Sequence, residues 1–384
     1  MNKKRLFMVA ILAVALLAVG CAGGEEAAQE ENAQQAQEEA AELKVGIVLS
    51  SGGKGDKSFN DSALRGLSRA QEEGLISNYK YLEPKQVSVV EKNLRFLAEN
   101  GYDLVIGVGF MQKDAVTKVS KEFPETKFAI VDEVVENDNV ASITFKEHHG
   151  SFLAGAFAAL MTNQEGIEGI NEEQVVGFLG GMDMPLIHKF ELGYTSGVEY
   201  INKREGTNVK TKVTYAGSSP SAFNDPAKGK EIALSQYNSG ADIIYHASGG
   251  TGGGLFNAAQ KEGHYAIGVD SDQDYIAPGY ILTTMQKRVD NAVYDVVESL
   301  KNDNFEAGIK EYGLAKEGIK VSLSGLGPMT KAALESGDIS QEEADKIREM
   351  KDMIPGEIKE RIKEIRDQII AGEIEVPNYL AQQN

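Results

Sequence analysis

The sequence has no means of forming an internal disulfide, because it contains a single cysteine, Cys21, among 384 residues. Stability must therefore come from a packed core rather than from crosslinks. Beyond residue 20 the chain also lacks any apolar run close to the about 20 residues that a membrane-spanning helix needs. We therefore expect the remaining chain to lie outside the bilayer.

Familiar catalytic and metal-binding motifs are missing as well. The sequence contains no GxSxG nucleophile elbow and no HExxH zinc motif. The acids of VDSDQD (269–274) lack the spacing, the central glycine and the closing glutamate of an EF-hand. The glycine-rich segment GGTGGG (249–254) lacks the GK[ST] of a P-loop and does not match the GxGxxG pattern of a dinucleotide-binding fold. We expect a binding protein rather than an enzyme, with no cofactor and no metal ion.

Positive charge is scarce: 39 Lys and Arg stand against 58 Asp and Glu, a net charge of −19. Nucleic-acid binding depends on cationic surface that neutralises phosphates. We therefore expect no nucleic-acid partner.

The N-terminus has the pattern of an exported lipoprotein. A cationic start is followed by 15 apolar residues (6–20), a length that fits the apolar region of a signal peptide. Small residues before a cysteine in LAVGC (17–21) resemble the lipobox of bacterial lipoproteins. We expect residues 1–20 to be a signal peptide and Cys21 to be acylated, for example with palmitate, so that the lipid bilayer is a partner. The protein would then sit on the extracytoplasmic face of the cell membrane.

The remainder divides into an acidic tether and two α/β lobes. Residues 21–42 contain no aromatic or large aliphatic side chain, which predicts a flexible acidic tether. From Leu43 onward, short β-branched runs alternate with amphipathic segments, a rhythm that predicts parallel sheets covered by helices. The expected strands are 44–50, 103–109, 127–132 and 141–145, then 174–180, 209–215, 241–247, 265–270 and 280–285. The charged tail from residue 328 is expected to be helical and to pack on one lobe.

Chemically useful residues follow the ends of these strands, where parallel sheets gather their ligands. Aromatic rings, carboxylates, amides and glycines together suit an uncharged ligand with a flat ring and several hydroxyls. Each residue alone has a simpler interpretation: Phe59 or Phe223 as a lid over the core, Asp132 as a helix cap.

Several segments resemble the basic membrane lipoprotein family, the purine nucleoside receptor-like substrate-binding lipoproteins of ABC transporters. The resemblance runs from about residue 44 to 325 and is carried by GDKSFN (55–60), KFAIVD (127–132), FNDPAKGKEIA (223–233), ASGGTGGG (247–254) and IGVDSDQDYIAPGYILTTMQKRVD (267–290). It implies a type I periplasmic-binding fold, with two Rossmann-like lobes joined by a three-segment hinge. The expected N-terminal lobe is 43–146 with about 275–306. The expected C-terminal lobe is 147–274 with about 307–384, including the tail. The resemblance assigns no role to the charged segment 328–360.

The same resemblance assigns each of the following residues a role in binding a nucleoside. Phe59 and Phe223 would sandwich the base. Asn60 and Asp132 would bond to the edge of the base. Gly249, Asp270 and Lys287 would hold the ribose, and Asp56 and Ser58 would shape the first loop.

Two positions depart from the family pattern. Ser50 stands where the family commonly has an Asp that touches the ligand. Phe223 lies in a longer loop than usual, which leaves Phe190 as an alternative ring partner.

The expected function is capture of a nucleoside, with purines favoured, and its delivery to ABC permease subunits by a monomeric protein. Two alternatives stay open. The same fold would also suit a sugar or another small polar solute, and a sensor would differ only in the partner that it contacts.

Overall fold

The computed structural model describes residues 43–382. The predicted signal peptide, the tether and Cys21 lie outside the described residues. Within that range, no helix combines the length and the apolar character needed to cross a membrane.

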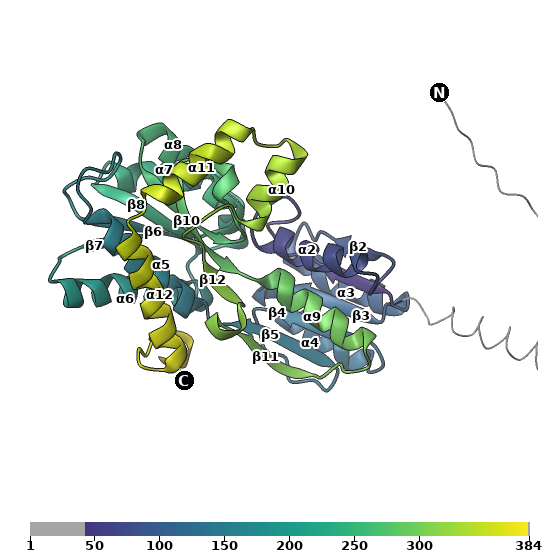
Figure 1. Cartoon of the computed structure of the whole chain (residues 1–384). Coiled ribbons are helices and arrows are strands. Elements are labelled where there is room, and N and C mark those ends of the chain that lie inside the picture. The colour runs from purple at the N-terminus through teal and green to yellow at the C-terminus, as the bar shows by residue number, and fades with distance from the viewer. Residues whose placement is uncertain (1–42, 383–384) are drawn as a thin grey trace, which may run out of the picture. The chain divides into compact units, whose positions relative to one another are not determined.

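The first lobe is built on a fully parallel sheet, in the order β11-β5-β4-β3-β1-β2. Helices α2 and α9 cover one face, and α3 and α4 cover the other (Figure 1). Its central strands are Val- and Ile-rich and buried, as expected for strands covered on both sides. The bounds are β1 Val45–Val48, α2 Phe59–Glu72, β2 Tyr79–Leu82, α3 Val90–Glu99, β3 Leu104–Val108, α4 Lys113–Glu122, β4 Lys127–Val131, β5 Val140–Phe145, α9 Val289–Lys301 and β11 Gly308–Tyr312.

The second lobe has a sheet in the order β12-β10-β9-β8-β6-β7, parallel except for the β10–β12 pair. Helices α5 and α6 cover one face, and α7 and α8 cover the other. The bounds are α5 Glu147–Thr162, β6 Val175–Met182, α6 Pro185–Glu205, β7 Lys210–Gly217, α7 Pro226–Tyr237, β8 Ala241–Ala247, α8 Gly252–Glu262, β9 Tyr265–Asp270, β10 Ile281–Lys287 and β12 Ile319–Val321.

The two halves of the chain repeat one topology and exchange their last helices. The order β1-α2-β2-α3-β3-α4-β4-β5 recurs as β6-α6-β7-α7-β8-α8-β9-β10. Helix α5, which follows β5, packs on α6 of the second lobe, and α9, which follows β10, packs on α2 of the first. The chain therefore crosses between the lobes at about residues 146, 288 and 313–318. This is a type I periplasmic-binding fold.

The return of the chain to the first lobe is shifted from its predicted position of about 275–306. Strand β10 (281–287) belongs to the second sheet, whereas α9 and β11 belong to the first. The sequence concealed this because β11, GIKEY, is a largely exposed edge strand without an apolar pattern.

The tail forms three helices, α10 Pro328–Ser336, α11 Gln341–Met353 and α12 Gly356–Ala371. The tail is helical as predicted, but α11 and α12 are separated at Pro355, which cannot donate to a continuing helix. Helix α12 packs on α5 of the second lobe.

Candidate functional site

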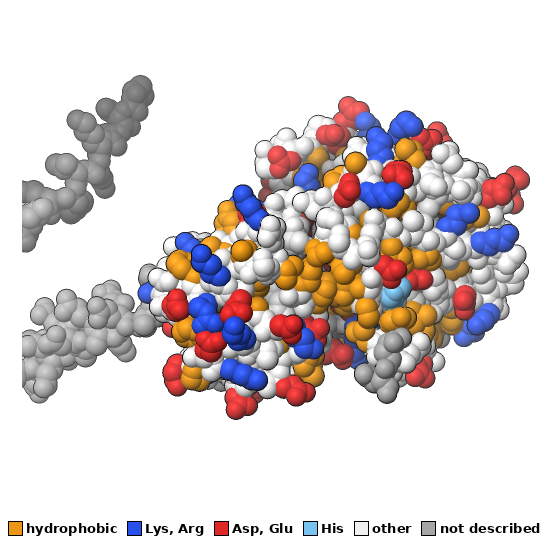
Figure 2. All heavy atoms as spheres, turned by 180° about the vertical axis from the view of Figure 1, so that it is seen from behind, with side chains coloured by type: hydrophobic (Ala, Val, Ile, Leu, Met, Phe, Trp, Pro, Cys, Tyr) orange, Lys and Arg blue, Asp and Glu red, His pale blue; other side chains and the backbone are white. Residues whose placement is uncertain are grey.

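A cavity of about 410 Å³ is lined by residues from both lobes. Its walls come from the carboxyl ends of strands, including β1, β3 and β4 of the first sheet and β8, β9 and β10 of the second. Figure 2 shows hydrophobic side chains gathered on the surface where the two lobes meet.

Ten of the eleven predicted site residues line this cavity. They are Ser50, Asp56, Phe59, Asn60, Asp132, Phe190, Phe223, Gly249, Asp270 and Lys287. The exception is Ser58, which is fully buried beneath it. Its hydroxyl donates to Asp270 Oδ2 at 2.6 Å and so links the first lobe to the second.

Phe59 is the first residue of α2 and presents its ring to the cavity. Gly109, after β3, has φ 99°, and a Cβ on it would lie 3.6 Å from Phe59 Cε1. The backbone conformation therefore requires glycine here, whereas the distance to the ring is an ordinary contact. The Lys287 ammonium lies 5.0 Å from the centre of the Phe59 ring, within range of a cation–π attraction.

Asn60 is engaged inside its own loop. Its Oδ1 accepts from the Ser50 amide at 2.8 Å, and its Nδ2 donates to Asp56 Oδ2 at 2.8 Å and to Ser50 Oγ at 2.9 Å. Both amide hydrogens thus have partners, so contact with a base edge requires an exchange of these bonds. Asp56 also accepts from three backbone amides at the start of α2, and burial raises the pKa of its carboxyl group.

The second ring, Phe223, ends the short 3-10 helix Pro220–Phe223. A Cβ on Gly181 would lie 2.5 Å from Phe223 Cε1, so this close contact requires glycine. Gly249 has φ 54°, and a Cβ on it would lie 3.2 Å from the Phe223 carbonyl oxygen. Phe190 of α6 also lines the cavity but is buried, with 4% of its surface exposed.

A chain of alternating charges lies at the base of the cavity. Lys287 Nζ is 2.6 Å from Asp132 Oδ2 and 3.1 Å from Glu147 Oε1. Glu147 Oε2 in turn accepts from Lys189 Nζ at 2.6 Å. All four side chains are at most 8% exposed. Lys287 ends β10 and Glu147 begins α5, so the cluster sits at two of the three crossings between the lobes.

The neighbouring charges shift the pKa values of these side chains. Burial alone would raise the pKa of Glu147, but Lys189 and Lys287 lower it to about 2. Burial alone would lower the pKa of Lys287, but Asp132, Glu147 and Asp270 raise it above its ordinary value. Burial raises the pKa of Asp270 to about 6, against the opposing effect of Lys287.

Asp132 and Asp270 occupy equivalent positions in the repeated topology, at the ends of β4 and β9. Both have positive φ values, 69° and 63°. This left-handed conformation is uncommon for a non-glycine residue, and such strain concentrates at functional sites.

The sequence interpretation missed several parts of the site. Glu147 and Lys189 carry no local signal, because their partners are distant in sequence. Further lining residues follow β2 and β3 or begin α6, among them Pro84, Gln86, Val87, Phe110, Met111, Leu186 and Ile187. Of these, only Phe110, directly after a predicted strand end, had a usable sequence signal.

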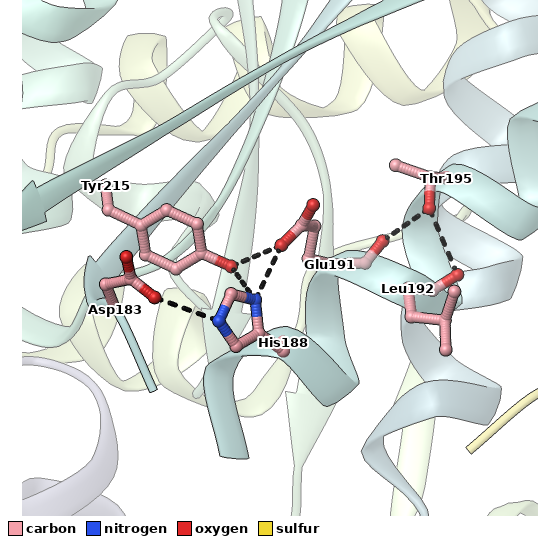
Figure 3. A network of polar contacts seen from close by, with 6 residues as sticks. All are labelled: Asp183, His188, Glu191, Leu192, Thr195 and Tyr215. Atoms are coloured by element: carbon pink, nitrogen blue, oxygen red, sulfur yellow. Dashed lines mark hydrogen bonds and ion pairs between the residues drawn. The ribbon is translucent and has the colours of Figure 1, made fainter. Parts of the chain in front are cut away.

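A polar network holds the first turn of α6, next to the cavity residues Leu186 and Ile187 (Figure 3). His188 Nε2 lies 2.9 Å from Asp183 Oδ1, and its Nδ1 lies 3.0 Å from Glu191 Oε2. The Tyr215 hydroxyl contacts both His188 and Glu191. Burial and Glu191 raise the pKa of Tyr215, so its phenol stays protonated. Among residues 43–382, no group of His, Cys, Asp or Glu is arranged to hold a metal ion.

Comparison with known proteins gives a consistent picture. A family described as "ABC transporter substrate-binding protein PnrA-like" matches residues 43–379. The chain is 30% identical to "ABC transporter nucleoside-binding protein BmpA" of Lactococcus lactis, over 98% of this chain and 99% of that protein. It is 32% identical to an uncharacterized lipoprotein of Pyrococcus abyssi, over 95% and 85%. A solved ABC transporter solute-binding protein from Aeropyrum pernix superposes with a TM-score of 0.79 at 31% identity, over 87% and 94%.

Proposed function

Because this chain belongs to the PnrA-like family of ABC transporter substrate-binding proteins, we propose that its ligand is a nucleoside, with purines favoured. The observation that carries the proposal is the pairing of Phe59 and Phe223, one from each lobe, at a cavity that also contains Asp132, Asp270 and Lys287. The similarity to a nucleoside-binding protein of Lactococcus lactis supports it. The proposed ligand is handed to the membrane subunits of an importer.

The two aromatic rings are placed to stack on the base of the proposed nucleoside. Stacking on an aromatic side chain contributes about 1–3 kcal/mol per base in proteins that bind single strands. Rings on separate lobes meet both faces of a base only when the lobes close, so stacking favours the closed form. The loops of the two lobes lie close enough to touch on closure, because Ser51 Oγ of the first lobe is 3.5 Å from the Pro220 carbonyl of the second.

The charged residues are suited to hydrogen-bond the hydroxyl groups of the sugar. Asp270 Oδ2 is occupied by Ser58, but the side chain still lines the cavity beside Lys287. Asp132 Oδ1 lies 2.6 Å from Lys287 Nζ in an ion pair but accepts no hydrogen bond within residues 43–382, so it keeps the capacity to accept one from a ligand hydroxyl or amine. Because Lys287 and Glu147 lie at crossings between the lobes, a ligand that bonds to Lys287 acts directly on the hinge.

The charge of the cavity favours a nucleoside over a nucleotide. Asp56, Asp132 and Asp270 line it against the single buried cation Lys287, with Lys85 at its edge. Two unit charges of like sign a few ångströms apart repel by about 4 kcal/mol at an effective dielectric constant near 20. A phosphate should therefore weaken binding at least about 100-fold.

Calorimetric titration of residues 43–384, refolded to remove carried ligand, tests both statements. We expect one-to-one binding of guanosine, adenosine or inosine, with weaker binding of uridine and much weaker binding of guanosine monophosphate. Light scattering on the same sample should show a monomer. Binding of ribose without any response to nucleosides would instead support the sugar alternative and refute the aromatic-sandwich assignment.

We propose further that the protein is held on the extracytoplasmic membrane surface through acylated Cys21. The lipobox pattern of residues 17–21 and the lipoprotein relative from Pyrococcus abyssi support this. Cells fed labelled palmitate should label the full chain and should not label the Cys21→Ala variant. Equal labelling of both proteins would contradict the assignment.

A further inference from the structure

Five consecutive polar residues begin at the last residue of β9, and all of them are buried. Asp270, Ser271, Asp272, Gln273 and Asp274 are exposed by 7, 3, 3, 1 and 0%. Buried polar groups are costly unless each finds a partner. Besides partners in its own lobe, this loop, residues 270–274, has partners in the first lobe and in the tail.

Three of the five residues reach the first lobe. Ser58 Oγ donates to Asp270 at 2.6 Å, and Ser271 Oγ donates to the Ser58 carbonyl at 2.8 Å. Gln273 Nε2 donates to the Lys57 carbonyl at 3.1 Å. These bonds connect the loop to the segment that carries Phe59.

The other two residues reach the charged tail. Asp272 Oδ2 accepts from the Thr330 amide at 2.9 Å, in the first turn of α10. A Cβ on Gly327 would lie 2.2 Å from that same oxygen, so this approach requires glycine.

The second tail contact is a buried ion pair. Lys351 Nζ of α11 is 2.9 Å from Asp274 Oδ2, and it donates to the Leu282 and Ser322 carbonyls at 2.8 and 3.1 Å. Both charged side chains are at most 1% exposed. A buried lysine with a carboxylate and two carbonyls as partners has a fixed position, unlike Lys346 of the same helix, whose side chain is about half exposed.

We propose that α10 and α11 form a buttress that positions the 270–274 loop, and that Lys351 is a positioning residue for ligand binding through Asp270. The charged tail therefore has a role in the site, which its sequence of alternating charges does not indicate. This proposal rests on the proposed function only for the identity of the ligand.

The test compares two substitutions of buried tail residues, each made in the protein of residues 43–384. Lys351→Met removes the contact with the loop. Ile369→Ala weakens α12, whose main packing partner is α5. Guanosine affinity, thermal unfolding and hydrogen exchange of peptides covering 265–287 in ligand-free protein are measured for both variants.

We expect Lys351→Met to weaken guanosine binding at least tenfold and to speed exchange in the loop. Ile369→Ala should lower the unfolding temperature but leave affinity within about twofold and loop exchange unchanged. Equal effects of the two variants, or none from Lys351→Met, would overturn the proposal.

Two provisions keep the test decisive. If Lys351→Met does not fold, the double variant Lys351→Met/Asp274→Asn removes the unpaired buried carboxylate and should still show weak binding and fast loop exchange. If the wild type binds no nucleoside, the proposed function fails, while loop exchange still decides whether the tail positions the loop.

Discussion

Replacing Lys287 with methionine is expected to abolish ligand binding and to lower the thermal midpoint of unfolding by several degrees. The substitution leaves Asp132 and Glu147 buried with one fewer cation, since Lys287 Nζ lies 2.6 and 3.1 Å from their carboxylates. Breaking a buried pair by removing one partner costs about 3–5 kcal/mol. In a chain of this size each kcal/mol corresponds to roughly 2 °C.

The sign of the pH dependence gives this prediction a second check. In the wild type the pKa of Glu147 is lowered to about 2, so its pairing stabilises the fold at neutral pH and is lost only as pH falls toward that value. Burial already raises the pKa of Asp132 in the wild type, and Lys287 opposes that rise. Without Lys287 the pKa values of Asp132 and Glu147 should both be higher than in the wild type, so the folded variant binds more protons as pH falls. The deficit of the variant should therefore shrink between pH 7.5 and pH 5.

Thermal unfolding at these two pH values measures the effect, with Lys301→Met as the control. Lys301 is an exposed residue at the end of α9. A Lys287→Met protein that matches this control in stability, or whose deficit grows as pH falls, would show that the charge cluster is not what holds the base of the cavity.

Phe59→Ala is expected to weaken nucleoside binding by about 5- to 150-fold, the equivalent of 1–3 kcal/mol of stacking. The ring lines the cavity next to Lys287. Phe223→Ala should have a similar effect from the other lobe.

Calorimetric titration with guanosine measures both losses. Phe96→Ala is the matched control, because Phe96 is 42% exposed on α3 of the same lobe and lies outside the cavity lining. If Phe223→Ala binds like this control while Phe190→Ala loses binding, the ring opposite Phe59 is Phe190. If Phe59→Ala also binds like the control, the ligand does not stack there.

The sequence was informative about the fold where burial dictates composition. Runs such as LVIGV and ADIIYHA predicted β3 and β8, because strands covered on both faces must be apolar. The strands that were missed, β2, β11 and β12, read YKYL, GIKEY and IKV. The first two lie at sheet edges with exposed charged residues, and the third is only three residues long.

The sequence was likewise informative about only those site residues that have a local pattern. Asp132, Asp270 and Lys287 could be predicted to meet because each ends a strand, and parallel strands bring their carboxyl ends to one edge. Glu147, Lys189 and Lys351 could not, since a charged residue on a helix is normally exposed. Their burial depends on partners 42 to 140 residues away in the chain, contacts that no local pattern encodes.

The exchange of α5 and α9 has a consequence for the order in which the chain can fold. The first sheet remains without its outer strand β11, and α2 without its neighbour α9, until synthesis has passed residue 312. During that interval β5 is an open edge, and an unpaired edge strand invites association with other chains. The N-terminal half therefore cannot complete its sheet by itself, and the stage before β11 pairs with β5 is the one most exposed to aggregation.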